Sequence, residues 1–238
     1  MRPAGTCLPA GRSSRAIPTM TEGPRTSHAL AGQDGGPRYI RCEPMGVGEV
    51  MNSSSGWRSG ARTMATDLDP ITEAAGAIMN WLPRGAFLTV RHEARLNTMT
   101  IGWATVGVVW SRPVCMVAVR DSRYTFGLIE AAADFTVSVP TTPAMNQALA
   151  FCGSRSGRDV DKFAACSLVP QPARKTASPI VSLVGVHLEC TVICRSAIDP
   201  ARLAERLSSL YPKRDYHSLY FGEVRACYRT DSDSDAPA

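Results

Sequence analysis

Residues 85–110 read GAFLTVRHEARLNTMTIGWATVGVVW and are rich in β-branched and aromatic side chains. Residues 85–92 and 97–110 both have the composition of β-strands. The residues between them, Glu93-Ala94-Arg95, have the character of a hairpin turn. This stretch therefore predicts antiparallel strand pairing and a mainly β fold.

Short strands and short helices alternate through the rest of the chain from Asp67 onward. Strands are predicted at 114–120, 134–139, within 179–196 and at 218–228, with glycine bulges at Gly102 and Gly107. Helices are predicted at 70–82 after an Asp69 cap, at 125–133, at 143–151, at 159–166 with Asp159 as cap, and at 200–210. Strands at short spacing with inserted helices indicate a small closed antiparallel barrel.

The first 63 residues differ in composition from the remainder. They hold 10 Gly and 6 Pro and show no sustained hydrophobic period. We interpret residues 1–63 either as a disordered extension or as the result of a start codon assigned too far upstream. Residues 64–230 are interpreted as one folded domain and residues 231–238 as an acidic tail.

Charge argues against a nucleic-acid-binding protein. Residues 1–63 carry 8 Arg and 4 acidic residues, whereas residues 64–238 carry 18 Lys plus Arg and 17 acidic residues. The basic excess therefore belongs to the first segment, and the predicted domain is nearly neutral. No apolar stretch is long enough for a membrane-spanning helix, so we expect no membrane association.

The eight cysteines show neither a C-x-x-C pair nor other metal-ligand spacing. Scattered thiols used as small hydrophobic residues are typical of a reducing compartment, which predicts a cytoplasmic protein without a metal site.

A polar strip interrupts the apolar strand after the hairpin turn. Asn97 and Met99 share one face of that strand, and Thr98 and Thr100 share the other. Short hydrogen-bonding side chains in this pattern suit a planar ligand with a polar edge. A half-exposed strand with a ladder of threonines is the structural alternative.

Two cationic segments have the character of anion sites. Arg120, Ser122, Arg123 and Thr125 lie between a buried strand and a helix, where backbone N–H groups and cations together favour a phosphate. Residues 152–163 form a second segment, with glycines that permit a tight loop and cations that could cover a phosphate. A capped helix and a basic surface loop are the alternatives.

His217 opens the last predicted strand and stands alone in sequence. A histidine beside a redox ligand can donate a hydrogen bond or a proton, although a histidine of purely structural role gives the same pattern.

Taken in order, these segments resemble the flavin reductase-like family of FMN-binding split barrels, and most closely its flavoredoxin-like branch. The resemblance covers about residues 70–228. It is carried by residues 82–88, 97–103, 112–113, 120–125, 135–138, 152–163 and 187–190, and by His217 with residues 222–224. Residues 196–216 are longer than the hairpin usual in the family.

The resemblance implies a six-stranded antiparallel Greek-key barrel that forms a homodimer with FMN near the interface. It implies that Asn97, Thr98, Met99 and Thr100 line the isoalloxazine and ribityl chain. The ribityl phosphate would be met by Arg120, Ser122, Arg123 and Thr125. A segment that closes over the flavin would contain Ser156, Arg158 and Lys162. His217 would lie near the reactive ring.

Three functions are compatible with this resemblance. The first is an NAD(P)H:flavin oxidoreductase that transfers hydride from NADH or NADPH to flavin and delivers electrons to a monooxygenase or another redox partner. The second is a flavoredoxin-like electron-transfer flavoprotein reduced by a protein partner. The third is a flavin-binding module without redox turnover.

Overall fold

The computed structural model describes residues 65–231 of the chain. Our predictions for residues 1–63, and for the tail beyond Asp231, lie outside the described residues. Within residues 65–231 no helix is long and apolar enough to cross a membrane.

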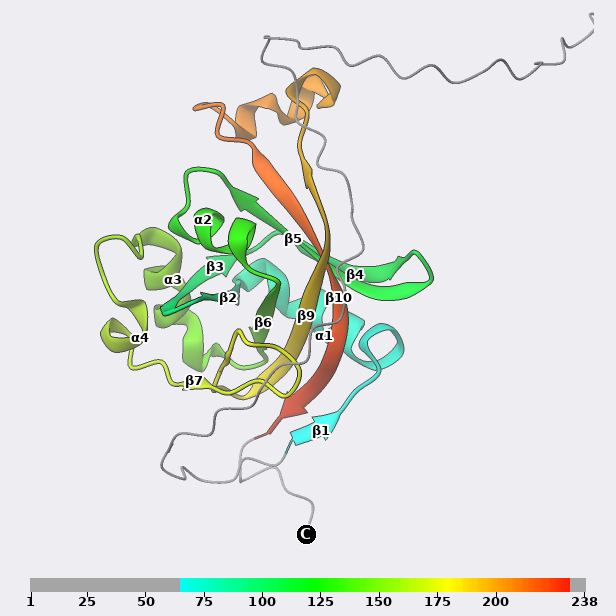
Figure 1. Cartoon of the computed structure of the whole chain (residues 1–238), viewed down its shortest axis with the longest axis vertical. Helices are drawn as coiled ribbons and strands as arrows, with labels where there is room; N and C mark the ends of the chain where they lie inside the picture. Colours follow the sequence, from blue (N-terminus) through cyan, green and yellow to red (C-terminus); the bar gives the residue numbers. More distant parts are fainter. Residues whose placement is uncertain (1–64, 232–238) are drawn as a thin grey trace, which may run out of the picture. The chain divides into compact units, whose positions relative to one another are not determined.

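Strands make up most of the regular structure (Figure 1). Their bounds are β1 (Ala65–Asp67), β2 (Ala86–His92), β3 (Arg95–Ile101), β4 (Ala104–Val109), β5 (Arg112–Arg120), β6 (Asp134–Pro140), β7 (Pro170–Gln171), β8 (Ile180–Val181), β9 (Gly185–Ala197) and β10 (His217–Thr230).

The helices are short. The α-helices are α1 (Ala75–Trp81), α2 (Tyr124–Ala131), α3 (Asn146–Ser154) and α4 (Lys162–Ala165). Short segments of other helix types are η1 (Pro70–Ala74), η2 (Leu82–Arg84), η3 (Pro143–Met145), η4 (Pro200–Arg202) and η5 (Glu205–Leu210).

Eight strands pair antiparallel in one sheet, in the order β3-β2-β6-β9-β10-β5-β4 with β1 added on β10, and β7 pairs antiparallel with β8 in a second sheet. The six strands from β3 to β5 enclose the main core. Gly102 and Trp103 connect β3 to β4, and the Trp103 carbonyl accepts a hydrogen bond of 3.1 Å from the Ala118 N–H, which extends the pairing of β4 with β5. The predicted mainly β architecture is therefore confirmed, and β4 continues as a hairpin with β5 beyond the barrel (Figure 1).

The main core fills the barrel with apolar side chains from every wall strand, and two helices add to it. Ile78 of α1 and Leu128 of α2 are both almost completely buried in this core. A second cluster lies where Phe87 of β2 packs against Leu149 of α3. Burial of apolar area in these two clusters is the main force that holds the helices on the sheet.

The first helical segment follows the sequence prediction closely. Asp69 caps it by accepting hydrogen bonds from the backbone N–H groups of Ile71 (2.9 Å) and Thr72 (2.7 Å). Pro70 occupies the first helical position, where its missing N–H costs nothing.

Two glycine predictions need correction. Gly107 pairs in regular register with Val114, so it is not a bulge. Gly102 lies in the break between β3 and β4, so residues 97–110 form two strands rather than one. The register shifts occur instead between β10 and β9, at Phe221/Gly222 and Val224/Ala226.

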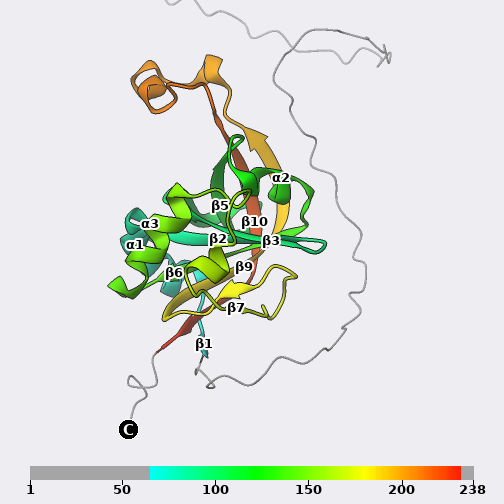
Figure 2. The ribbon, with the colours of Figure 1, turned by 90° about the vertical axis from the view of Figure 1, so that its left-hand side faces the viewer.

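A long connection, residues 198–216, joins β9 to β10 and is called the arm. The prediction of one amphipathic helix over 200–210 is wrong, because the arm contains two 3-10 segments, η4 and η5. Leu207 and Leu210 stay 36% and 42% exposed. A helix this short is stable only when its apolar face packs against the rest of the protein. The arm projects beyond the barrel in both views, so this packing is missing (Figures 1 and 2).

The α3–α4 loop, residues 155–161, ends at a different helix cap from the one predicted. Asp161, rather than Asp159, caps α4 by accepting from the N–H groups of Phe163 (2.9 Å) and Ala164 (3.3 Å). The helix is consequently shorter than the predicted 159–166.

Candidate functional site

The polar strip on β3 divides between two faces, as its alternation predicts. On one face Asn97 donates from Nδ2 to Thr125 Oγ1 at 2.7 Å, and Met99 joins the main core. This bond ties the strip directly to the first turn of α2. Asn97 and Thr125, predicted as separate parts of one site, are therefore in contact.

On the other face of β3 the two threonines have partners of their own. The hydroxyl groups of Thr98 and Thr89 lie 3.1 Å apart, and Thr100 donates to the Leu149 carbonyl of α3 at 2.6 Å. The four residues therefore cannot present all their side chains to one ligand. Because β3 ends the strand path, a ligand in contact with all four would meet the backbone of this strand.

The α3–α4 segment packs against both faces of β3. Gly153 of α3 lies against Thr100. Gly157 of the α3–α4 loop lies against Asn97 and Tyr124, so closely that a Cβ on Gly157 would stand 2.2 Å from Asn97 Oδ1. The segment predicted to close over the ligand is thus in direct contact with the polar strip.

Arg120 and Ser122, both predicted to meet a phosphate, bind the arm. Arg120 Nη1 donates to Asp215 Oδ1 at 2.7 Å, and its Nη2 donates to the Leu210 carbonyl at 2.9 Å. Ser122 donates to the second oxygen of the same carboxylate at 3.2 Å. Although desolvation opposes the shift, Arg120 and Ser122 hold the pKa of Asp215 below its usual range.

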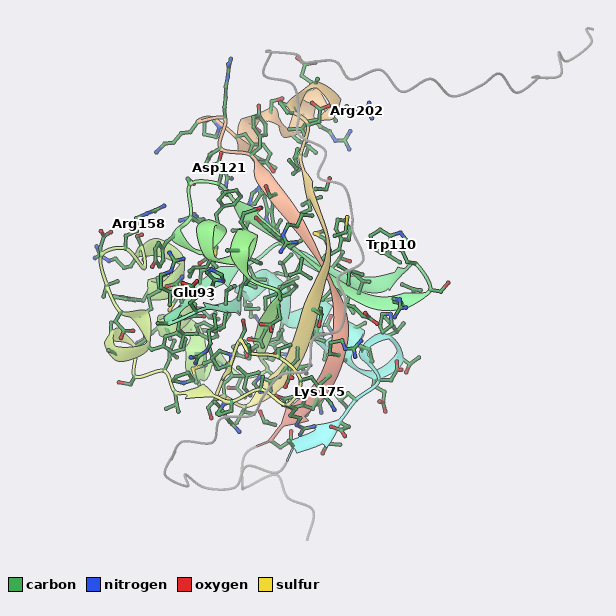
Figure 3. All side chains as sticks on the ribbon, viewed as in Figure 1. Glu93, Trp110, Asp121, Arg158, Lys175 and Arg202 are labelled. Carbon is green, nitrogen blue, oxygen red and sulfur yellow. The ribbon has the colours of Figure 1, made fainter. Side chains whose placement is uncertain are left out.

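The amino end of α2 is flanked by Arg123, Tyr124 and Arg158. No side chain caps this end among the described residues, and Arg123 occupies the cap position. Arg158 donates to the Ser122 carbonyl at 3.4 Å, and its guanidinium lies 5.6 Å from the centre of the Tyr124 ring. Unpaired N–H groups beside two cations suit an anion. Figure 3 shows Arg158 and Asp121 on the flank of the molecule that carries α2.

Ser156 and Lys162 shape the loop that carries Arg158. The Ser156 hydroxyl accepts from the Arg158 N–H at 3.2 Å. Lys162 is only 4% exposed and donates from Nζ to the Cys152 carbonyl at 2.8 Å. Burial lowers the pKa of Lys162, and burial raises the pKa of the Cys152 thiol to about 12. Lys162 thus fastens the two ends of the loop, and Cys152 stays protonated and unreactive.

His217 begins β10 directly opposite Arg120 of β5. Its ring is covered by Trp103, with centroids 4.5 Å apart, and its Nδ1 lies 2.9 Å from the Tyr211 hydroxyl. Burial, followed by the positive charge of Arg120, lowers the pKa of His217 to about 4. His217 is therefore neutral at physiological pH.

The structure brings the four predicted segments together. Asn97 links the strip to α2, Arg158 links the α3–α4 loop to Ser122, and Ser122 links that loop to the arm. Sequence reasoning missed Tyr211, Asp215, Trp103 and Gly157, although Trp103 and Gly157 lie inside the quoted motifs. In the described part of the chain no group of three metal-ligating side chains occurs.

Residues 79–238 match the family described as flavin reductase like domain. The chain therefore belongs to the flavin reductase-like family.

Individual relatives are distant. An uncharacterized protein of Archaeoglobus fulgidus is 31% identical over 111 residues, which are 47% of this chain and 62% of that protein, so the match spans less than two thirds of the relative. The FMN-binding domain of a flavin reductases-like enzyme from Shewanella baltica has a TM-score of 0.52 and 18% identity, covering 72% of this chain and 80% of that chain. The flavoredoxin of Desulfovibrio vulgaris has a TM-score of 0.48 and 22% identity, covering 79% and 83%. The Shewanella structure confirms the predicted split-barrel fold.

Proposed function

We propose that this chain binds FMN and acts as an NAD(P)H-dependent flavin reductase. The observation that carries the proposal is the convergence of the polar strip, the amino end of α2 and the α3–α4 loop in a member of the flavin reductase-like family. A bound flavin supplies the redox chemistry, because its ring accepts a hydride from a reduced nicotinamide.

The residues of this chain fit the phosphate end of such a cofactor. The amino end of α2 offers unpaired N–H groups, and Arg123 and Arg158 add positive charge beside it. We assign the phosphate to these groups and to Thr125. Arg120 and Ser122, whose donors are engaged by Asp215 and the Leu210 carbonyl, hold the arm beside this site.

The ring end is assigned to β3 and His217. The backbone of residues 97–100 would orient the planar ring, and Asn97 would hold this strand to α2. Ser156 and Lys162 would hold the α3–α4 loop over the ring. His217 is an orienting hydrogen-bond donor, because a hydride transfer asks little of a neutral side chain.

We also propose that the chain works as a homodimer. The β4–β5 hairpin carries an exposed apolar strip in which Val108 of β4 is 63% and Trp110 of the turn is 56% exposed. Trp110 lies at the tip of the β4–β5 hairpin, away from Arg158 (Figure 3). A second copy of this chain would cover the strip, and Val108→Asp should shift sedimentation from dimer to monomer.

We place the protein in the cytoplasm, since its thiols have the pattern of a reducing compartment.

The deciding experiment is an absorbance spectrum of the purified full chain, followed by anaerobic addition of NADH and then NADPH. Flavin bands that bleach rapidly with one nucleotide support a reductase and identify the donor. Bands that bleach only with dithionite would replace the proposal by a flavoredoxin-like electron carrier. A protein that neither carries nor binds FMN would overturn both functions.

A further inference from the structure

His217 has an asymmetric environment that distinguishes its two ring nitrogens. Its Nδ1 lies 2.9 Å from the Tyr211 hydroxyl, and the indole of Trp103 lies over its face. The charged groups that act on the ring are Arg120 of β5, Asp121 and Arg123 of the β5–α2 connection, and Asp215 of the arm. At 8% exposure the ring has little contact with water, so Tyr211 has a strong influence on its hydrogen bonding.

The hydrogen bond between Tyr211 and His217 has a preferred direction. Burial raises the pKa of the Tyr211 hydroxyl, so this group keeps its proton. The neutral imidazole has one unprotonated nitrogen, which accepts hydrogen bonds more strongly than a phenol oxygen does. The Arg120 guanidinium lies 4.9 Å from the centre of the Tyr211 ring, and this positive charge strengthens the phenol as a donor.

Tyr211 is held in place by the packing of the arm. Arg120 binds the Leu210 carbonyl next to Tyr211 and the Asp215 carboxylate beyond it. The Tyr216 ring packs on Tyr211 at a centroid distance of 4.8 Å. These contacts fix the arm before and after Tyr211 in the sequence, and so they keep the Tyr211 hydroxyl at His217 Nδ1.

We infer that Tyr211 is a positioning residue that holds His217 as the tautomer protonated at Nε2, so that Nε2–H becomes a fixed hydrogen-bond donor. The tautomer itself follows from contacts within the chain. The use of this donor rests on the proposed function: it would serve an oxygen acceptor on the bound flavin ring or on the nicotinamide carboxamide.

The first test is nitrogen NMR of the uniformly ¹⁵N-labelled full chain. The chain has four histidines, and His217→Gln identifies the resonances of His217. Two-bond proton–nitrogen correlations show which ring nitrogen carries the proton. We expect Nε2–H alone in the wild type and a mixture of tautomers in Tyr211→Phe, which keeps the ring and removes the hydroxyl. Tyr216→Phe is the matched control and should leave the tautomer unchanged.

The inference is overturned if the wild type carries its proton on Nδ1, or if Tyr211→Phe has the wild-type tautomer. Both results are obtained without flavin, so they are independent of the proposed function. A protein that shows the Nε2–H tautomer but binds no FMN would refute the proposed function and leave the positioning role intact.

A kinetic test applies to the FMN-loaded protein. We expect Tyr211→Phe to lower kcat for flavin reduction about fivefold, with KM for the nicotinamide donor nearly unchanged. The same substitution in a His217→Gln background should have no further effect, because Tyr211 acts through His217. Additive losses would show that Tyr211 acts independently of His217.

Discussion

Gly157 lies against the carboxamide of Asn97, and a Cβ at this position would stand 2.2 Å from Asn97 Oδ1 and 2.7 Å from Tyr124 Cδ1. This contact brings the α3–α4 loop onto the polar strip of β3. The distance between loop and strand therefore depends on a residue without a side chain.

Gly157→Ala should displace the α3–α4 loop from β3. We expect FMN affinity to fall by about tenfold, because overpacking a close contact costs roughly 1–3 kcal/mol. Fluorescence titration with FMN measures the effect. Gly107→Ala is the control, since a Cβ on Gly107 meets nothing within 4 Å. Equal affinities for the two variants would mean that the loop does not contribute to the flavin site.

Arg158→Ala should weaken the binding of FMN more than that of riboflavin. A charged hydrogen bond to phosphate is worth roughly 1.5–3 kcal/mol, so we expect FMN affinity to fall about 10- to 100-fold. Riboflavin lacks the phosphate and should bind with nearly unchanged affinity. Arg202→Ala serves as the control because Arg202 lies on the arm (Figure 3). If both ligands lose affinity equally, Arg158 does not bind the phosphate.

Asp215→Asn should loosen the arm. The substitution weakens the ion pair between Asp215 and Arg120, in which each side chain is 20% exposed. Hydrogen exchange in residues 198–216 should speed up several-fold, while the strands of the barrel keep their protection. Asp199→Asn removes the charge of a second arm carboxylate, which is 19% exposed and pairs with Arg202, and tests whether any lost charge has this effect. Unchanged exchange in Asp215→Asn would show that the arm is held by its aromatic packing instead.

Acid should destabilise the fold through two buried histidines. Burial lowers the pKa of His187 to about 4 and that of His217 to about 4, against an ordinary value of 6.5. The unfolded chain takes up these protons first, so their contribution is complete above pH 6.5 and is lost as the pH falls to about 4. For His187 the loss is roughly 3 kcal/mol.

Urea unfolding between about pH 7 and about pH 4.5 measures this loss. His187→Gln removes the titrating group, so its unfolding free energy should depend less steeply on pH. A variant with the same slope as the wild type would locate the acid sensitivity elsewhere in the chain.

Local patterns predicted most of the secondary structure. The β-rich composition of residues 85–92 predicted β2, and Asp69-Pro70 predicted the start of the first helix, because strand preference and helix capping depend on neighbouring residues. The arm was mispredicted because Leu207 and Leu210 have helical spacing but lack a surface to cover.

The sequence by itself determined most of the barrel strands, the Asp69 cap of the first helical segment and the segments that carry the polar and cationic groups. The tertiary structure decided how those groups are used. Arg120 binds Asp215, 95 residues away, and so holds the end of the arm at which the Tyr211 hydroxyl meets His217. Local preferences act over a few residues, whereas the partner of a buried or charged side chain is selected by the packing of distant segments.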